Sequence, residues 1–271
     1  MSSRSFPLLC LIPLAIFTLA FLALPLVRLV AASGSTERGW TIYADILTNA
    51  RYMQALVSTV LVSAAVTLAA LAVSTTAGLF LERNRFPGRG ALIAVLTFPL
   101  AFPGVVVGFM IILLGGRQGL TNEISTGLFN TRIVFAYSML GLFFGYLYFS
   151  IPRVLLTVMA AAEKLDRDIE EAARSLGAGP FRILRDVILP GLAPALIAAG
   201  AIAFATAMGA FGTAFTLATD IDVLPMVIYT EFTLSANIAM ACALSVLLGL
   251  VTWVLLLLAR SLSGITVAAS G

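Results

Sequence analysis

The side chains that most often carry enzyme chemistry are scarce in this sequence. Its 271 residues include no histidine, one lysine (Lys164) and two cysteines, Cys10 and Cys242, which lie far apart in apolar runs. Histidine and cysteine are the usual ligands of transition metals, and histidine is the commonest proton carrier near neutral pH. A P-loop needs a lysine directly after a glycine, whereas Lys164 follows Glu163. We therefore expect no catalytic residue, metal site, disulfide or cofactor, and no ATP site of this kind.

Charged residues gather instead in one segment, from Arg153 to Pro190, between two long apolar runs. Two short helices are expected there. Asp166 and Asp168 suit a helix start, because acidic side chains complement the helix dipole. The following apolar residues recur with helical spacing and are mostly small: Ile169, Ala172, Ala173 and Leu176.

Glycine and proline mark the end of the first helix and the start of the second. Gly177 and Gly179 can stop a helix, and Pro180 suits the first turn of the next one. The second helix is expected to have its own apolar stripe, made of Phe181, Leu184 and Ile188. Pro190 and Pro194 are expected to break the chain where the next long apolar run begins.

Two interpretations of this segment remain. An amphipathic helix lying on lipid headgroups is usually rich in Lys and Arg on its polar face, with large apolar residues opposite. This segment has six basic and six acidic residues, and its first helix presents alanines. That pattern favours a surface on which another protein docks.

The run EEAARSLGAGPFRILRDVILPG resembles the EAA loop of bacterial ABC importer permeases. The family pattern is Glu-Ala-Ala, three residues, glycine, nine residues, isoleucine, one residue and Leu-Pro. The matching positions here keep every spacing and differ only by valine for isoleucine: Glu171, Ala172, Ala173, Gly177, Val187, Leu189 and Pro190. The resemblance implies that these residues couple the chain to an ATPase subunit.

The segments around this loop have the composition of membrane spans. The chain is 61% hydrophobic and 11% charged, against about 45–50% and 25% in soluble domains. Six stretches reach the roughly 20 apolar residues that cross a bilayer: residues 6–32, 56–81, 91–114, 133–159, 191–218 and 237–259. The first is too long for a signal peptide, so we expect a retained anchor.

These features predict an all-α membrane protein with one domain, residues 1–271. We expect six transmembrane helices and a cytoplasmic loop at residues 160–190. The resemblance extends to this arrangement and implies the type I ABC importer permease fold. Eleven of the 16 Lys and Arg residues fall on the side of the N-terminus, so both termini are expected in the cytoplasm. The arginines lie between apolar runs, which indicates topology rather than nucleic-acid binding.

Acidic residues are absent from the middle of all six predicted spans. Carriers driven by protons or sodium normally need such a carboxylate, so this class is disfavoured. A membrane scaffold without transport activity is a third reading, but it would not need a docking loop of this spacing. The chain itself is expected not to be an enzyme.

The run ATAMGAFGTAFT in the fifth predicted span has two interpretations. Its small residues can serve close packing of helices. Alternatively, part of the run lines a transport pathway, with the two bulky side chains as a gate: Thr206, Met208, Phe211 and Thr213. The acidic residues that follow also have two readings, a solvated outer loop or a surface that attracts a cationic solute or a binding protein: Asp220, Asp222 and Glu231.

The resemblance implies a set of partners for this chain. They are two copies of a cytoplasmic ATPase subunit, a second permease that is the same or a related chain, a periplasmic substrate-binding protein and the lipid of a bacterial inner membrane. Residues 98–108 and 223–232 are similar to the subgroup that carries polyamines, ferric iron, thiamine or aminoethylphosphonate. The expected cargo is therefore a small polar solute of one of these kinds.

The expected topology can be tested by labelling single cysteines introduced at Ser2, Ser175 and Ser235. Only the cysteine at position 235 should react with a reagent confined to the periplasmic side, because the basic residues place the other two in the cytoplasm. Periplasmic labelling at position 175 would reverse the topology.

Overall fold

The computed structural model describes residues 5–35, 39–217 and 221–262, and all regular structure in these ranges is helical. The first half contains α1 (Ser5–Thr18), η1 (Leu19–Ala23), α2 (Leu24–Ser33), η2 (Gly39–Thr41), α3 (Ile42–Thr48), α4 (Ala50–Arg83), α5 (Arg89–Thr97), η3 (Phe98–Ala101), α6 (Gly104–Gly115) and α7 (Leu120–Phe129). The second half contains α8 (Met139–Ala162), α9 (Arg167–Ser175), α10 (Pro180–Ile183), η4 (Leu184–Ile188), α11 (Leu189–Met208), α12 (Gly212–Leu217), α13 (Leu224–Thr233) and α14 (Ile238–Leu262).

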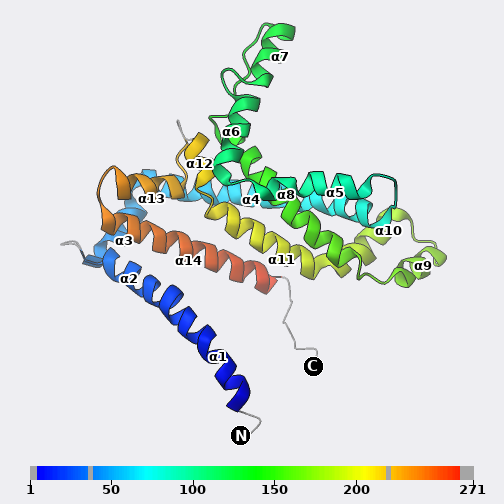
Figure 1. Cartoon of the computed structure of the whole chain (residues 1–271), viewed down its shortest axis with the longest axis horizontal. Helices are drawn as coiled ribbons and strands as arrows, with labels where there is room; N and C mark the ends of the chain where they lie inside the picture. The colour runs from blue at the N-terminus through cyan, green and yellow to red at the C-terminus, as the bar shows by residue number, and fades with distance from the viewer. Residues whose placement is uncertain (1–4, 36–38, 218–220, 263–271) are drawn as a thin grey trace.

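Six of the described helical runs are long and apolar enough to cross a membrane: Leu11–Ser33, Ala50–Arg83, Gly104–Phe129, Met139–Ala162, Pro180–Met208 and Ile238–Ala259. The expected all-α membrane fold is therefore confirmed. The long helices α4, α8, α11 and α14 form a layer, with α9 and α10 at one end and α3 and α13 at the other (Figure 1). Helix α2 meets α14 at the edge of this layer.

The third predicted span, residues 91–114, is not one continuous helix. Helix α5 passes into the short η3, and the chain is extended at Phe102 and Pro103 before α6 begins. Pro99 and Pro103 have no backbone N–H to donate, and the ring of each blocks the regular helix. Helices α6 and α7 then leave the layer of long helices as a projecting arm (Figure 1).

The fifth predicted span, residues 191–218, differs in two ways. Helix α11 ends at Met208, and a separate α12 begins at Gly212. Residues 218–220, at the predicted end of the span, lie outside the described residues. The predicted breaks at Pro190 and Pro194 are wrong, because the helical run from Pro180 continues through both of them to Met208. The π-helical η4 precedes Pro190, which then occupies the first turn of α11, where a backbone N–H is not needed.

Helix α4 lies against both α8 and α11. Its buried face is a line of small side chains at helical spacing: Ala55, Thr59, Ser63, Thr67, Ala70, Ser74 and Gly78. Small residues allow helices in a membrane to approach closely, so that dispersion forces hold them together. The Ser74 hydroxyl also donates to the carbonyl of Ile151 on α8, at 3.0 Å.

Gly78 is the closest point of this contact. A Cβ atom at this position would lie 2.9 Å from Cγ1 of Val158 on α8. We expect Gly78→Val to destabilise the chain by about 1–3 kcal/mol, because neither helix backbone can move apart freely. The midpoint of thermal aggregation in detergent should fall by roughly 3–8 °C.

Gly249 provides a matched control for this substitution. It also lies inside a membrane-spanning helix, α14, but a Cβ atom there would meet nothing within 4 Å. Gly249→Val should leave the midpoint nearly unchanged. Equal shifts for the two variants would contradict close packing at Gly78.

Candidate functional site

Helix α9 begins and ends where the sequence predicts. The Asp166 side chain accepts a hydrogen bond from the Asp168 backbone N–H at 2.9 Å and so caps the helix. Gly177 has a φ of +81°, in the left-handed region that favours glycine. The backbone N–H of Ala178 donates back to the Ala173 carbonyl at 3.0 Å, which closes the helix end.

An ion pair joins α9 to the end of α4. The Arg83 guanidinium donates to both carboxylate oxygens of Glu170, with Nη1 to Oε2 at 2.7 Å and a second bond from Nη2 to Oε1. The Glu170 side chain is only 7% exposed, while that of Arg83 is 30% exposed. This two-point contact fixes both the distance and the orientation of α9 relative to α4.

Sequence reasoning missed this pair and chose the neighbouring Glu171 instead. Glu171 is exposed, whereas Glu170 lies on the side of α9 that faces α4. Ala173, three residues after Glu170, faces the same way and is half-buried. This helical spacing was the available signal, but an arginine 87 positions away in sequence cannot be assigned to it from the sequence alone.

The predicted apolar face of α9 is divided between two environments. Ala173 packs with a buried cluster that joins α4, α10, η4 and α11: Leu79, Ile183, Ile188 and Leu192. Val187 is half-buried against the same cluster. The stripe predicted for the second helix is therefore only partly right, since Ile188 is buried but Phe181 is 75% exposed.

The other side of this segment is open. Ile169 is 57% exposed and Leu176 is 89% exposed. Among the remaining positions of the EAA-like sequence, the exposed ones are Glu171, Ala172, Gly177, Leu189 and Pro190. We define the exposed face of α9–α10 as Ile169, Ala172, Leu176 and Phe181. Large apolar side chains standing free at the end of the helix layer mark a surface for a further contact.

The four candidate pathway residues lie near the end of α11, in two kinds of environment. Met208 and Thr213 are each 1% exposed and pack inside the chain. Thr206 is half-buried, and Phe211 is 36% exposed. Of these four candidate residues, Thr206 and Phe211 reach the surface of the chain and the other two do not.

The two interrupted spans meet at these residues. The Thr213 hydroxyl of α12 donates to the Gly104 carbonyl at the start of α6, at 2.9 Å. The Tyr146 hydroxyl of α8 donates to the Ala210 carbonyl at 2.6 Å, in the gap between α11 and α12. In hydrocarbon a free carbonyl would cost several kcal/mol. The Tyr146 hydroxyl therefore gives a partner to a carbonyl left free where α11 ends, and the Thr213 hydroxyl fastens α12 to the start of α6.

Three aromatic rings form a cluster just after the gap between α11 and α12. The ring centroids of Phe211, Phe215 and Tyr229 lie 5.2–5.4 Å apart. Phe215 is 46% exposed. The cluster is therefore partly exposed at the surface, and two of its rings, Phe211 and Phe215, follow Thr206 closely in the sequence.

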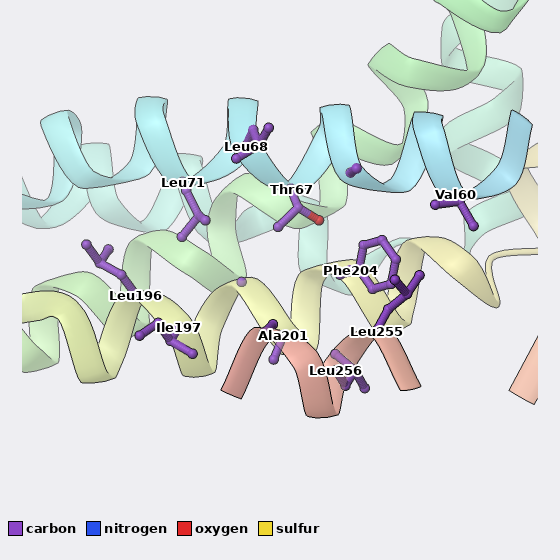
Figure 2. Close-up of a pocket in the computed structure, with 13 residues that line it drawn as sticks. Val60, Thr67, Leu68, Leu71, Leu196, Ile197, Ala201, Phe204, Leu255 and Leu256 are labelled. Carbon is purple, nitrogen blue, oxygen red and sulfur yellow. The ribbon is translucent and has the colours of Figure 1, made fainter. Parts of the chain in front are cut away.

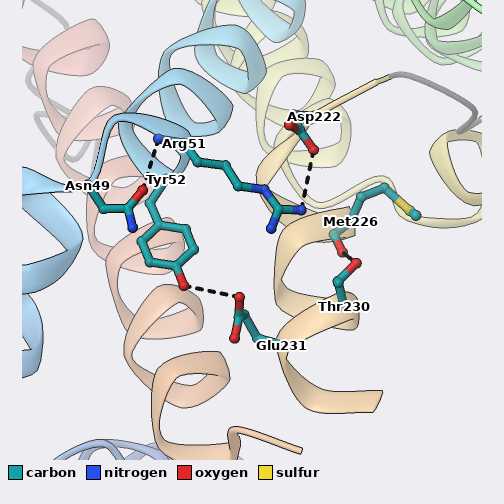
Figure 3. Close-up of polar contacts among 7 residues, drawn as sticks. All are labelled: Asn49, Arg51, Tyr52, Asp222, Met226, Thr230 and Glu231. Atoms are coloured by element: carbon teal, nitrogen blue, oxygen red, sulfur yellow. Dashed lines mark hydrogen bonds and ion pairs between the residues drawn. The ribbon is translucent and has the colours of Figure 1, made fainter. Parts of the chain in front are cut away.

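The acidic residues predicted for the last outer loop are not all solvated (Figure 3). The Tyr52 hydroxyl of α4 donates to Oε1 of Glu231 at 3.0 Å, and Glu231 is only 7% exposed. Asp222 is exposed and lies 3.8 Å from the Arg51 guanidinium. Asp220 falls outside the described residues. Within the part of the chain that the structure describes, no three His, Cys, Asp or Glu side chains come close enough to hold a metal ion.

A cavity of about 450 Å³ opens between α4, α11 and α14 (Figure 2). Its lining is almost entirely apolar, and the one hydroxyl in it donates to the backbone of its own helix. The lining includes Val60, Thr67, Leu71, Leu196, Phe204 and Leu255. Such a lining suits hydrocarbon and offers nothing to a charged or strongly polar solute.

Six apolar helical runs of this length indicate a multi-pass membrane protein. The chain belongs to the family described as binding-protein-dependent transport system inner membrane component, whose sequence profile matches residues 74–267. It is the permease subunit of an ABC importer in an inner membrane.

Several curated relatives are 30–34% identical to it over the aligned residues. The sulfate transport system permease protein CysT of Salmonella typhimurium is 34% identical, over 76% of this chain and 73% of its own length. The molybdenum transport system permease protein ModB of Escherichia coli is 32% identical, over 71% and 88%. A putative 2-aminoethylphosphonate transport system permease protein, PhnU of Salmonella typhi, is 30% identical, over 86% and 83%.

The fold is similar to that of a solved importer. The crystal structure of a bacterial ABC transporter involved in the import of the acidic polysaccharide alginate contains a chain that superposes with a TM-score of 0.79. The superposition covers 97% of each chain, at 18% sequence identity. The expected type I importer fold is thus confirmed.

The Arg83–Glu170 pair makes a testable contribution to the placement of α9. Glu170→Ala should leave the Arg83 guanidinium without its carboxylate and weaken the attachment of α9 by about 1–3 kcal/mol. Hydrogen exchange of the α9 backbone amides should become roughly 5–100-fold faster, while α4 remains protected.

Glu171→Ala is the control, because its exposed side chain has no role in this attachment. The double variant Arg83→Glu/Glu170→Arg, in which the two charges are swapped, should restore part of the protection of the α9 amides. Unchanged exchange in Glu170→Ala would show that the pair does not hold α9 in place.

Proposed function

We propose that this chain forms half of the translocation pathway of an ABC importer and that the exposed face of α9–α10 docks into a cytoplasmic ATPase subunit. The observation that carries the proposal is the exposure of Leu176 and Phe181, at 89% and 75%, on a segment that is otherwise tied firmly to the helix layer. Apolar groups of this size in water favour a partner that covers them. The EAA-like sequence lies in the same segment.

A mechanical connection supports this proposal. Movement of the ATPase subunits would pull α9, and the two-point Arg83–Glu170 contact would pass the displacement to α4. Helix α4 packs on α8 and α11, so the three helices would move as one body. Alternating access then follows from rocking this body against a second permease, with ATP favouring one of the two positions.

The remaining partners follow from this arrangement. We propose two copies of the ATPase subunit, a second permease that is the same or a related chain, and a periplasmic binding protein that delivers the solute. The distribution of basic residues supports a cytoplasmic location for both termini and for α9.

We propose that the pathway follows the side of α11 where Thr206 and Phe211 reach the surface. Met208 and Thr213 would support the wall from behind, since both are buried against neighbouring helices. The aromatic cluster of Phe211, Phe215 and Tyr229 is suited to close such a pathway, because bulky rings exclude water when they meet.

A small oxyanion is the cargo that we propose. Aminoethylphosphonate was among the solutes expected from the sequence, and one relative is named for its transport. Another relative is named for sulfate transport. Sulfate and phosphonates both present several anionic oxygens around a tetrahedral centre, so one type of site can serve either.

The docking proposal can be tested at Gly177, where the chain turns after α9. Gly177→Leu should abolish transport and detach the ATPase subunit while the protein still inserts, because a side chain obstructs both the φ of +81° and a close approach by the partner. Glu171→Arg, a change of charge on the same helix, should have the same effect. Loss of about 2–5 kcal/mol would lower the subunit affinity ~30-fold or more. Co-purification with the ATPase and uptake by vesicles measure the two effects.

Gly88 offers a matched control for backbone strain. It has a φ of +87° in the loop after α4, and a Cβ atom there would also meet nothing within 4 Å. Gly88→Leu should retain the ATPase subunit, since this position lies outside the docking segment. Wild-type co-purification and uptake in Gly177→Leu would disprove docking at this site.

A further inference from the structure

Arg153 is a cation within a membrane-spanning helix. It lies in α8, and about 13 Å of helix separates it from Ala162 at about 1.5 Å per residue. The sequence alone predicts it near the end of a span at 133–159, whereas α8 ends at Ala162. A charged side chain inside a bilayer is costly and commonly serves a pathway.

The guanidinium has one hydrogen-bonded partner among the described residues. Its Nη1 donates to Oγ1 of Thr206 on α11 at 2.9 Å. The Thr206 hydroxyl in turn donates to the Ile202 carbonyl at 2.7 Å, so its oxygen is free to accept from the arginine. None of the ion pairs in the described ranges includes Arg153. A guanidinium has five N–H donors. Among the described residues, only one of these donors of Arg153 has a hydrogen-bond acceptor.

Arg153 and Thr206 lie on the open side of the α8–α11 pair. The opposite side packs against Ala70 of α4 and is fully buried at Val154 and Ala203. Both members of the Arg153–Thr206 pair are half-buried, and Ile202, one turn before Thr206, is 54% exposed. The free donors therefore face the surface of this chain.

The direction of the arginine side chain argues against a lipid headgroup as its partner. Helix α11 begins at the end of the layer where α8 finishes, and Thr206 is about 26 Å along α11 from Leu189. An arginine that reaches for headgroups would point back toward the nearer end of its helix. Arg153 instead points toward Thr206, next to the gap where α11 stops at Met208.

Acidic residues are scarce in the membrane spans of this chain, and therefore in those of a second copy. None of the 13 Asp and Glu residues lies in α8, α11 or α14. Those in the other candidate spans lie toward the span ends: Glu82, Glu123 and Asp186. Arg153 therefore has no carboxylate partner among the described residues of its own chain. An anionic solute in the pathway would supply the missing negative charge.

We propose that Arg153 and Thr206 form the intramembrane contact for the anionic oxygens of the translocated solute, a small tetrahedral oxyanion. This inference rests on the proposed pathway and cargo. The free N–H groups of Arg153 would donate to two solute oxygens at once, a geometry that guanidinium matches better than ammonium. Thr206 holds the guanidinium in place from the side of α11.

The test uses the complete importer in proteoliposomes: this chain, its second permease, its ATPase subunits and its binding protein. Radiolabelled sulfate and 2-aminoethylphosphonate are the probes. Arg153→Gln should lower the maximal rate of ATP-dependent uptake at least 10-fold, with assembly and basal ATP hydrolysis unchanged. Arg153→Lys keeps the positive charge but loses the planar pair of N–H donors, so it should lower the maximal uptake rate about 3-fold or more.

Arg28 supplies the matched control, since it is an exposed arginine in the first membrane span. Arg28→Gln should keep uptake within about twofold of wild type. If Arg153→Gln does not insert into the membrane, Arg153→Lys and Thr206→Val test the proposed contact instead. Both variants must then slow uptake while the importer still assembles.

Several results would overturn the inference. Uptake by Arg153→Gln within about twofold of wild type would show that no contact is needed. Dissociation of the second permease from that variant would assign Arg153 to the subunit interface. A defect seen only in vesicles with phosphatidylglycerol would assign it to headgroups. An assembled wild-type importer that transports neither probe would refute the oxyanion cargo, whereas failure to bind the ATPase subunits would refute the docking proposal separately.

Discussion

Every backbone N–H and C=O group inside a bilayer must find a partner within the protein, and this constraint governs the whole structure. Long helices satisfy it most simply, and α4, α8, α11 and α14 do so over most of their length. At the two interruptions, before α6 and after α11, side chains from other helices bond to the backbone. The hydroxyl groups of Tyr146 and Thr213 bond to the carbonyls of Ala210 and Gly104. The first bond gives a partner to a carbonyl in the gap after α11, and the second ties α12 to the start of α6.

Close packing between the long helices makes this part of the molecule rigid. Small side chains along α4 bring it so close to α8 that Gly78 has no room for a Cβ atom beside Val158. Such interfaces move as rigid bodies because they deform little. The Arg83–Glu170 contact adds α9 to this body at one end. A force on α9 therefore has a direct route into the helices that carry Thr206 and Arg153.

Charge is used sparingly in the membrane part of the chain, which makes its placement informative. The acidic side chains near the spans are satisfied at the ends of the layer, as Glu231 is by Tyr52 and Glu170 by Arg83. Arg153 differs, because its hydrogen bond among the described residues is to the neutral hydroxyl group of Thr206. The apolar cavity between α4, α11 and α14 has no comparable polar group free to bind a solute. The polar groups that remain free on α8 and α11 therefore lie away from this cavity.

The sequence by itself determined the class of structure and much of its local detail. Apolar runs of bilayer length specify spanning helices whatever their neighbours are, and capping residues act within a few positions along the chain. Hence the six apolar spans and the limits of α9 at Asp166 and Gly177 could be predicted. The tertiary structure decided which side of each helix is covered. It turned Glu170 and Ala173 inward, left Glu171 and Leu176 exposed, buried Met208 and Thr213, and divided two predicted spans. These outcomes depend on partners that lie far away in sequence, such as Arg83 for Glu170, and a periodic pattern contains no information about such partners.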